Sequence, residues 1–210
     1  MAELLLKKGQ TKTLPGNGNN KFVGGLGWDA AVGSDEKVDL DLWILRYRSG
    51  NPSPDIIAWA NGECYRPDLG TNSEGAPWMA TPELDVVHQG DDRTGAGSAT
   101  GYDEIVTIDP SKAPADVERY VILASYYEDP DTSSGKTLGM ATSIVCGFKD
   151  EASGHELKAP VEEDHGFDVT AHVVTISKTP DGKWQMQNVD EGFSEKADTV
   201  VVQNFGFVAS

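Results

Sequence analysis

Hydrophobic positions in this chain come in short runs separated by glycine, proline and polar residues. Between residues 38 and 44 the sequence VDLDLWI alternates, so Leu40 and Leu42 would face one side of a strand and Asp39 and Asp41 the other. Short runs rich in β-branched and aromatic residues occupy positions 38–47, 55–59, 105–108, 120–127, 141–148, 171–177, 183–188 and 199–207. Many short strands between turn residues predict an all-β sandwich or barrel with few short helices.

The segments between these runs differ in character. Residues 178–183, KTPDGK, have the proline and glycine chemistry of a tight turn, which predicts a hairpin. Residues 60–85 contain many turn-forming residues and predict an irregular surface insertion, in which Trp78 and Met79 indicate that the segment folds back onto the body. Residues 149–168 are charged and predict an exposed connection. Without an internal repeat, the pattern favours one domain over residues 1–210.

Charge narrows the classes of partner. The chain has 17 Lys and Arg against 34 Asp and Glu, for a formal net charge of −17. A surface this acidic repels nucleic acid and anionic lipid and attracts cations. No stretch approaches the roughly 18 apolar residues of a membrane helix, and the N-terminal sequence MAELLLKK does not have the pattern of a signal peptide. We therefore expect a cytoplasmic protein with no membrane insertion and no nucleic-acid partner.

Three segments place carboxylates beside glycine: GLGWD at 25–29, VDLDL at 38–42, and GDDRTGAG at 90–97 with its continuation GYDE at 101–104. Asp39 and Asp41 would lie side by side on one strand face, where two like charges need an offset such as a bound cation. Calcium takes six to eight oxygen ligands in a flexible shell, which a glycine-rich acidic loop can supply. The scattered histidines and two distant cysteines, Cys64 and Cys146, do not favour zinc. Solvated acidic turns are the open alternative for each segment taken alone.

The order of these blocks resembles the TerD-type family of tellurium-resistance and stress-response proteins. The resemblance rests on GLGWD at 25–29, DLDL at 39–42, GDDRTG at 90–95 and the Asp-Glu pair at 103–104. It extends to LKKGQ at 6–10, PADV at 114–117 and Lys183-Trp184, and so covers nearly the whole chain. The resemblance implies a two-sheet β-sandwich with acidic calcium-binding loops at one end, acting as a binding module and not as an enzyme.

Carried over residue by residue, the resemblance implies a Ca²⁺ site drawn from Asp29, Asp39, Asp41, Asp91, Asp92, Asp103 and Glu104, with backbone oxygens from Gly90, Arg93 and Gly97. His88 directly precedes the third segment and could support it from outside. Trp43 shares a strand face with Asp39 and Asp41, where it could cover the metal or a partner contact. The chain departs from the family at Tyr102, where a further aspartate is usual, so one ligand is missing from the expected set.

These observations predict a calcium-binding scaffold module associated with tellurite or general stress resistance, with protein partners and self-association among its candidate interactions. A structural assembly component of an envelope complex or virus particle, stabilised by calcium in the same fold, is the alternative. A hydrolase using paired carboxylates as acid and base is a third class, which the glycine-rich context and the lack of a nearby aromatic platform disfavour.

Overall fold

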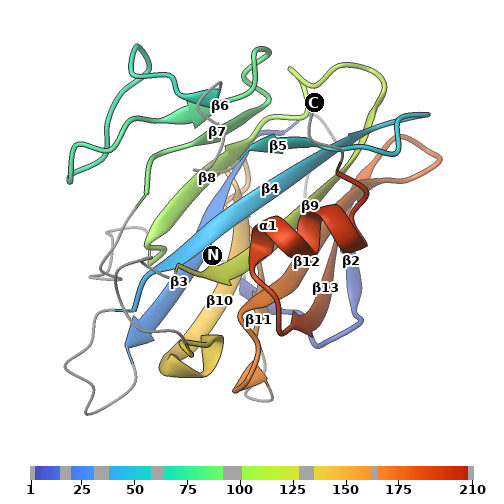
Figure 1. Cartoon of the computed structure of the whole chain (residues 1–210). Helices are drawn as coiled ribbons and strands as arrows, with labels where there is room; N and C mark the ends of the chain where they lie inside the picture. The colour runs from blue at the N-terminus through green and yellow to red at the C-terminus, as the bar shows by residue number, and fades with distance from the viewer. Residues whose placement is uncertain are drawn as a thin grey trace.

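The computed structural model describes residues 3–14, 20–30, 38–57, 64–91, 101–127, 135–161 and 165–207. Within these residues thirteen strands form two sheets (Figure 1). One sheet has seven strands in the order β1 (Glu3–Leu5), β11 (Glu156–Pro160), β10 (Ala141–Asp150), β3 (Phe22–Ala30), β8 (Glu104–Ile108), β7 (Val86–His88) and β6 (Met79–Ala80). The other has six in the order β2 (Thr11–Thr13), β13 (Trp184–Phe193), β12 (Thr170–Lys178), β9 (Val117–Tyr126), β4 (Leu40–Arg48) and β5 (Asp55–Ile57). The prediction of an all-β, two-sheet sandwich is confirmed.

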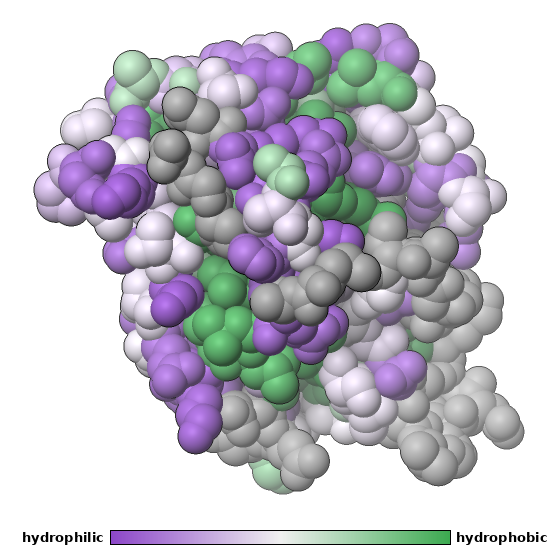
Figure 2. All heavy atoms as spheres, turned by 180° about the vertical axis from the view of Figure 1, so that it is seen from behind, coloured by the Kyte–Doolittle hydropathy of each residue, from purple (hydrophilic) through white to green (hydrophobic). Residues whose placement is uncertain are grey.

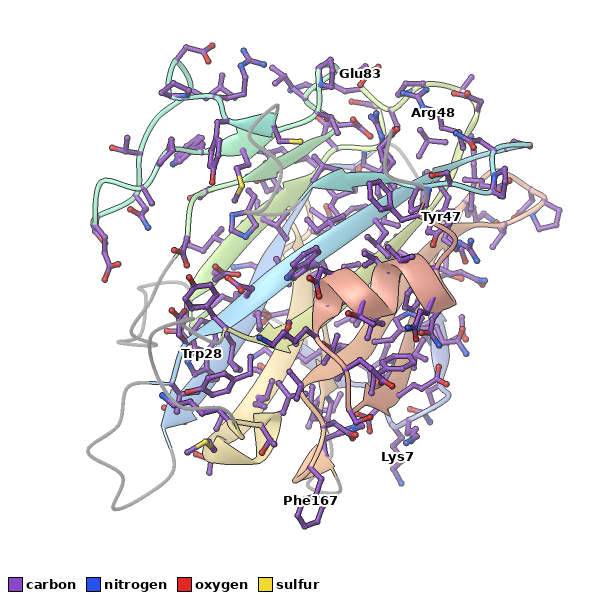
Figure 3. The ribbon with its side chains drawn as sticks, viewed as in Figure 1. Lys7, Trp28, Tyr47, Arg48, Glu83 and Phe167 are labelled. Atoms are coloured by element: carbon purple, nitrogen blue, oxygen red, sulfur yellow. The ribbon has the colours of Figure 1, made fainter. Side chains whose placement is uncertain are left out.

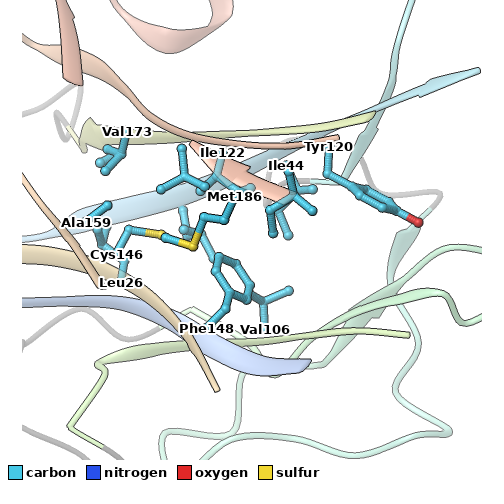
Figure 4. Packing of buried hydrophobic residues seen from close by; sticks show 14 of the residues in the cluster. Leu26, Ile44, Val106, Tyr120, Ile122, Cys146, Phe148, Ala159, Val173 and Met186 are labelled. Atoms are coloured by element: carbon cyan, nitrogen blue, oxygen red, sulfur yellow. The ribbon is translucent and has the colours of Figure 1, made fainter. Parts of the chain in front are cut away.

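The core lies between the two sheets, where alternate residues of each strand meet (Figure 4). Leu26 on β3 and Phe148 on β10 come from one sheet, and Ile44 on β4 and Ile122 on β9 come from the other. All four are fully buried, as is Met186 on β13. The alternation seen between residues 38 and 44 therefore places Leu40 and Leu42 in this core.

The C-terminal run at 199–207, predicted as a strand, is instead mostly helix α1 (Ala197–Asn204). Its valines favour a strand locally, but Ala197 and Val201, four residues apart on one helix face, pack onto the outer side of the six-stranded sheet. There they cover Trp43 together with Leu45, Tyr47, Val121 and Leu123. Trp43 is thus a packing residue beneath the helix, and the expectation that it contacts a partner is wrong. Within the described residues no helix has the length and apolar character needed to span a membrane.

Six strands were not predicted, namely β1, β2, β3, β6, β7 and β11, and two of them show why. Strand β3 contains Gly24, Gly25 and Gly27, which weaken any strand signal. A Cβ on Gly24 would lie 1.8 Å from the Gly147 carbonyl oxygen, and one on Gly25 would lie 1.8 Å from the Glu104 carbonyl oxygen, so close strand packing requires glycine at both positions. Strand β11 lies within residues 149–168, so the expectation of an exposed connection there is wrong; it holds β1 in parallel and β10 antiparallel.

The predicted hairpin at 178–183 is confirmed: the Thr179 N–H donates to the Lys183 carbonyl, and Gly182 has a φ of 81°. In the segment predicted as an insertion, isolated bridges join Tyr65 to Met79 and Thr71 to Pro77. Residues 65–79 therefore form a two-stranded arm, named here the 65–79 arm, which returns the chain to the edge of the seven-stranded sheet through β6. Met79 at its base is buried in the core.

Candidate metal centre

Three carboxylates from separate segments converge at one end of the sandwich. Asp41 is the second residue of β4, Glu104 is the first residue of β8, and Asp91 follows β7. One oxygen from each lies within 4.8 Å of the other two. Asp41 and Glu104 are 5 % and 1 % exposed, and Asp91 is partly buried. Because β4 belongs to one sheet and β7 and β8 to the other, the cluster joins the two sheets.

Backbone and histidine contacts fix the position of Glu104. The Leu42 N–H donates to Glu104 Oε2. Among the described residues, β5 pairs with β4 only from Ile44 onward, beyond Leu42. His88 Nε2 lies 3.4 Å from the same oxygen, while His88 Nδ1 accepts a hydrogen bond of 3.2 Å from the Gly90 N–H.

The state of His88 follows from its surroundings. Burial lowers the pKa of His88 to about 4, so the imidazole is neutral near pH 7. Since Nδ1 accepts a hydrogen bond from Gly90, the single ring proton is on Nε2, which faces Glu104. His88 Nε2 therefore faces Glu104 from beside the acidic cluster.

The 65–79 arm holds the Asp91 side of the cluster. Asn72 Oδ1 accepts hydrogen bonds from the Glu74 and Ala76 N–H groups, and Asn72 Nδ2 donates to the Asp91 carbonyl oxygen at 2.5 Å. Gly90 has a φ of 95°, and a Cβ there would lie 2.9 Å from the Ala76 carbonyl oxygen. The arm therefore packs directly on the acidic segment, and this contact requires glycine at position 90.

The chain that enters β8 is held by Tyr102 and Asp103. The Tyr102 hydroxyl donates to Glu156 Oε1 at 2.5 Å, across Gly147, where a Cβ would lie 2.1 Å from that hydroxyl. Asp103 Oδ2 accepts a hydrogen bond of 2.8 Å from the Trp28 N–H. The residue that stands in place of a family aspartate thus bonds to β11, across β3 and β10 of the same sheet.

The residues predicted as ligands therefore separate into distinct groups. The structure brings together Asp41, Asp91 and Glu104. Asp29 is exposed at the end of β3, Asp39 is partly buried outside this group, and Asp103 is bonded to Trp28. Gly90 shapes the backbone before Asp91. Asp92, Arg93 and Gly97 lie outside the described residues.

Sequence reasoning missed Asn72. The sequence TNSEG at 71–75 signals a turn, and Asn72 does form one through its side-chain oxygen. That its amide nitrogen also reaches Asp91, nineteen residues along the chain, depends on the folding of the arm over the sheet. No local pattern carries that information.

The donor set suits a hard divalent cation. Three carboxylates within 4.8 Å repel one another, by on the order of 3 kcal/mol per pair at an effective dielectric constant near 20. A divalent cation would offset this repulsion. Oxygen-only donors of this kind suit Ca²⁺ or Mg²⁺, and Ca²⁺ better tolerates a shell built from irregular loops.

Fold and site together define a two-sheet sandwich that brings together three acids from both of its sheets at one end. The TerD domain family matches residues 78–204, more than half of the chain. The chain belongs to the TerD domain family. The 65–79 arm lies almost wholly before the matched region.

Relatives and solved structures extend the match along the chain. The chain is 29% identical over 198 residues to the uncharacterized protein YceE of Bacillus subtilis (strain 168), covering 90% of this chain and 91% of the relative. It is 27% identical over 196 residues to general stress protein 16U of the same organism, covering 90% of each. A crystal structure of a homologue of the telluride resistance protein (TerD) from Streptomyces coelicolor A3(2) aligns with a TM-score of 0.64 at 16% identity, covering 87% of this chain and 95% of that one. A protein of unknown function, SAV2460, aligns with a TM-score of 0.62 at 14% identity, with the same coverage.

Proposed function

We propose that this chain is a calcium-binding, non-enzymatic scaffold module that serves tellurite or general stress resistance. Asp41, Asp91 and Glu104 would hold the ion, and its remaining ligands would be backbone oxygens and water. The observation that carries the proposal is the convergence of these three carboxylates, from both sheets, within 4.8 Å. The stress association is supported by the family and by the name of one relative, general stress protein 16U.

A bound ion at this position would act on the fold as a clamp. Because the acids come from β4 in one sheet and from the β7–β8 region in the other, cation binding would tie the two sheets together at this end. It would also order the acidic segment that the 65–79 arm contacts through Asn72. Calcium binding would thereby fix the shape of the surface at this end of the sandwich, where a protein partner could bind.

A non-enzymatic role is supported by how the titratable groups are used. His88, the histidine nearest the acids, is neutral and has both ring nitrogens facing protein groups. The three carboxylates face one another, whereas a glycosidase places two carboxyl groups on opposite sides of a substrate bond. This arrangement suits ion binding better than proton transfer.

Calorimetric titration of the chelator-treated full chain with Ca²⁺ and then Mg²⁺ tests the proposal. We expect calcium to bind with micromolar or tighter affinity and magnesium more weakly. Asp41→Asn and Asp91→Asn should each abolish or strongly weaken binding. Glu118→Gln, which removes one charge from an exposed position of β9, is the matched control and should bind like the native chain. Absence of calcium binding by the native chain would refute the proposal.

A structural assembly component is a second candidate, favoured by exposed apolar residues. Leu4 and Leu5 on edge strand β1 are 43% and 59% exposed, and Phe167 is 90% exposed. Figure 2 shows hydrophobic residues gathered within a largely hydrophilic face on the side turned away in Figure 1. Light scattering across a range of protein concentrations, with and without calcium, distinguishes the two. Association that depends on calcium and is lost in Leu5→Ser would favour assembly.

A further inference from the structure

One aromatic side chain points into solvent from the loop that precedes β12. Phe167 is 90% exposed, more than any other large hydrophobic residue that the structure describes. In Figure 3 it projects from the lower end of the molecule. A phenyl ring in water lacks the burial that usually stabilises aromatic residues, so contact with another apolar surface would be favourable.

The loop around Phe167 is held in place by hydrogen bonds. The Asp168 N–H donates to the His165 carbonyl at 3.1 Å, and His165 Nδ1 lies 2.8 Å from Asp168 Oδ2. The Thr137 hydroxyl donates to the Gly166 carbonyl at 2.9 Å. The backbone on both sides of Phe167 is therefore fixed, and the loop would lose little conformational freedom when the ring is bound.

A pocket of about 210 Å³ lies beside this loop. Leu138, Ala141, Ile144 and Val161 supply apolar walls, and Gly166 forms part of the lining. Because Gly166 directly precedes Phe167, the ring and the pocket lie on one surface. Phe167 does not fill the pocket of its own chain, since it is not among the lining residues and its side chain is exposed.

The described lining of this pocket can accept an apolar group without unpairing a buried polar group. His165 is the one titratable residue among these lining residues, and its ring nitrogens lie 2.8 and 2.7 Å from Asp168 Oδ2 and Asp190 Oδ1. Thr142 and Ser143 are exposed residues of the lining, and their hydroxyls can remain hydrated. An apolar side chain therefore suits the pocket.

We propose that two copies of this chain pair through this surface, with Phe167 of each copy in the pocket of the other. A twofold dimer needs a self-complementary patch, and a projecting ring beside a pocket on the same surface is such a patch. The size agrees, because a cavity of about 150 Å³ holds a benzene molecule, and this pocket is somewhat larger. A different protein would need both a matching ring and a matching pocket, whereas a second copy carries both.

The expected dimer is weak. Two phenyl rings would bury about 300–500 Å² between them, and even with the pocket walls this falls below the roughly 1,200–2,000 Å² of a standard interface. Two copies also repel one another, since each has a net charge of −17. We therefore expect a Kd of about 100 μM. The pairing does not rest on the proposed calcium site, and it gives the assembly candidate a defined interface.

Sedimentation velocity of the full chain at concentrations from about 10 μM to about 1 mM tests the proposal. The native chain should dimerise, and more tightly in about 0.5 M than in about 0.1 M NaCl, because salt screens the repulsion between the copies. Phe167→Ala should weaken the association by about tenfold or more. Val202→Ala, which shortens an exposed apolar residue of α1, is the matched control and should associate like the native chain.

A second variant tests the pocket itself. Thr142→Trp places a large ring at an exposed position of β10 that lines the pocket, so it should block entry and weaken association as Phe167→Ala does. A mixture of the two variants still offers one Phe167 ring and one open pocket. The mixture should therefore associate more tightly than either variant alone.

The calcium proposal and this one can fail separately. Dimerisation should persist in EDTA, which removes calcium, and in Leu5→Ser, which alters the exposed surface of β1. A native chain that stays monomeric up to about 1 mM, or native affinity in Phe167→Ala, would overturn the proposal. So would a mixture that associates no more tightly than its components, or loss of the dimer in EDTA or in Leu5→Ser.

Discussion

Strand β4 has a charged cluster near each end, and the two are built in opposite ways (Figure 3). Near its start, Asp41 meets two other carboxylates, from Asp91 and Glu104. Near its end, Arg46 is 3% exposed and pairs with Asp85, Glu83 and Asp55 at 2.6, 2.9 and 2.7 Å. In Figure 3, Arg48 and Glu83 mark the second cluster at the upper right, while Trp28 lies near the first at the lower left.

The comparison sets acids that surround an arginine beside acids that surround one another, which we propose hold a cation. Asp85 is fully buried and is surrounded by donors: the Arg46 guanidinium, the Thr81 hydroxyl at 2.6 Å and the Tyr120 hydroxyl at 2.9 Å. This network joins the sheets permanently. The Asp41 cluster joins the same two sheets, but its three carboxylates approach one another. Burial of acids is therefore a poor guide to metal sites, and the identity of their neighbours is a better one.

The largest expected effect comes from breaking the cluster around Arg46. Arg46→Met leaves Asp85 buried beside Glu83 without the guanidinium, which should lower the free energy of unfolding by about 3–5 kcal/mol. Urea unfolding measures this. Arg66→Met is the control, since Arg66 pairs with Asp68 at an exposed site, and its loss should change the free energy of unfolding little. A cost for Arg46→Met as small as that of the control would contradict the distinction between the two ends of β4.

At the acidic end, the presence of calcium should decide whether Asp41→Asn lowers the stability of the fold. At a hundredfold excess over Kd, calcium should stabilise the native chain by about 3 kcal/mol. Asp41→Asn should lose most of that gain. In EDTA the same substitution removes one of three like charges, and it should leave stability unchanged or raise it slightly. Thermal unfolding of both proteins in calcium and in EDTA measures the difference. A large loss of stability for Asp41→Asn in EDTA would mean that the acidic cluster is satisfied internally, like that of Arg46.

Alternation of polar and apolar residues was the most reliable signal for fold and site. It placed Leu40 and Leu42 in the core and drew attention to Asp41. It failed where tertiary packing overrides local preference. In β3 the glycines hide a strand because sheet packing leaves no room for side chains, and in α1 a valine-rich run becomes helical because one face covers the sheet.

The ligand candidates show a similar limit. The order of the acidic blocks led to the family and to all three clustered acids. Sequence order could not separate Glu104, which turns toward Asp41, from its neighbour Asp103, which bonds to Trp28. Nor could it show that Asn72 would hold Asp91 from a distant arm. Such choices depend on which way each side chain leaves its strand and on contacts that form only in the folded chain.

The 65–79 arm should affect the calcium affinity of the acidic cluster without supplying a metal ligand. Asn72→Ala removes the hydrogen bond to the Asp91 carbonyl and the turn that shapes the arm. Support lost outside the ligand shell commonly costs tenfold or more in metal affinity, so we expect calcium binding to weaken by about tenfold. Asn51→Ala is the control, because Asn51 caps only its own turn through the Ser53 N–H. Calorimetry that gave equal calcium affinity for both variants would show that the arm does not position Asp91.

The smallest expected effect is the acid dependence of the Arg46 end. The hydrogen bond from Arg46 lowers the pKa of Glu83 below its ordinary value, against the opposing effect of burial. A carboxyl group with a lower pKa in the folded state binds fewer protons there than in the unfolded chain, so its stabilising contribution is present above the unfolded pKa and is lost as pH falls through the folded pKa. In Glu83→Gln the free energy of unfolding should therefore decrease less between about pH 6 and pH 3 than it does in the native chain. Glu118→Gln, at an exposed position of β9, should leave this pH dependence unchanged. Equal slopes for the two variants would show that Glu83 adds little to this cluster, and that Asp85 and Asp55 balance Arg46.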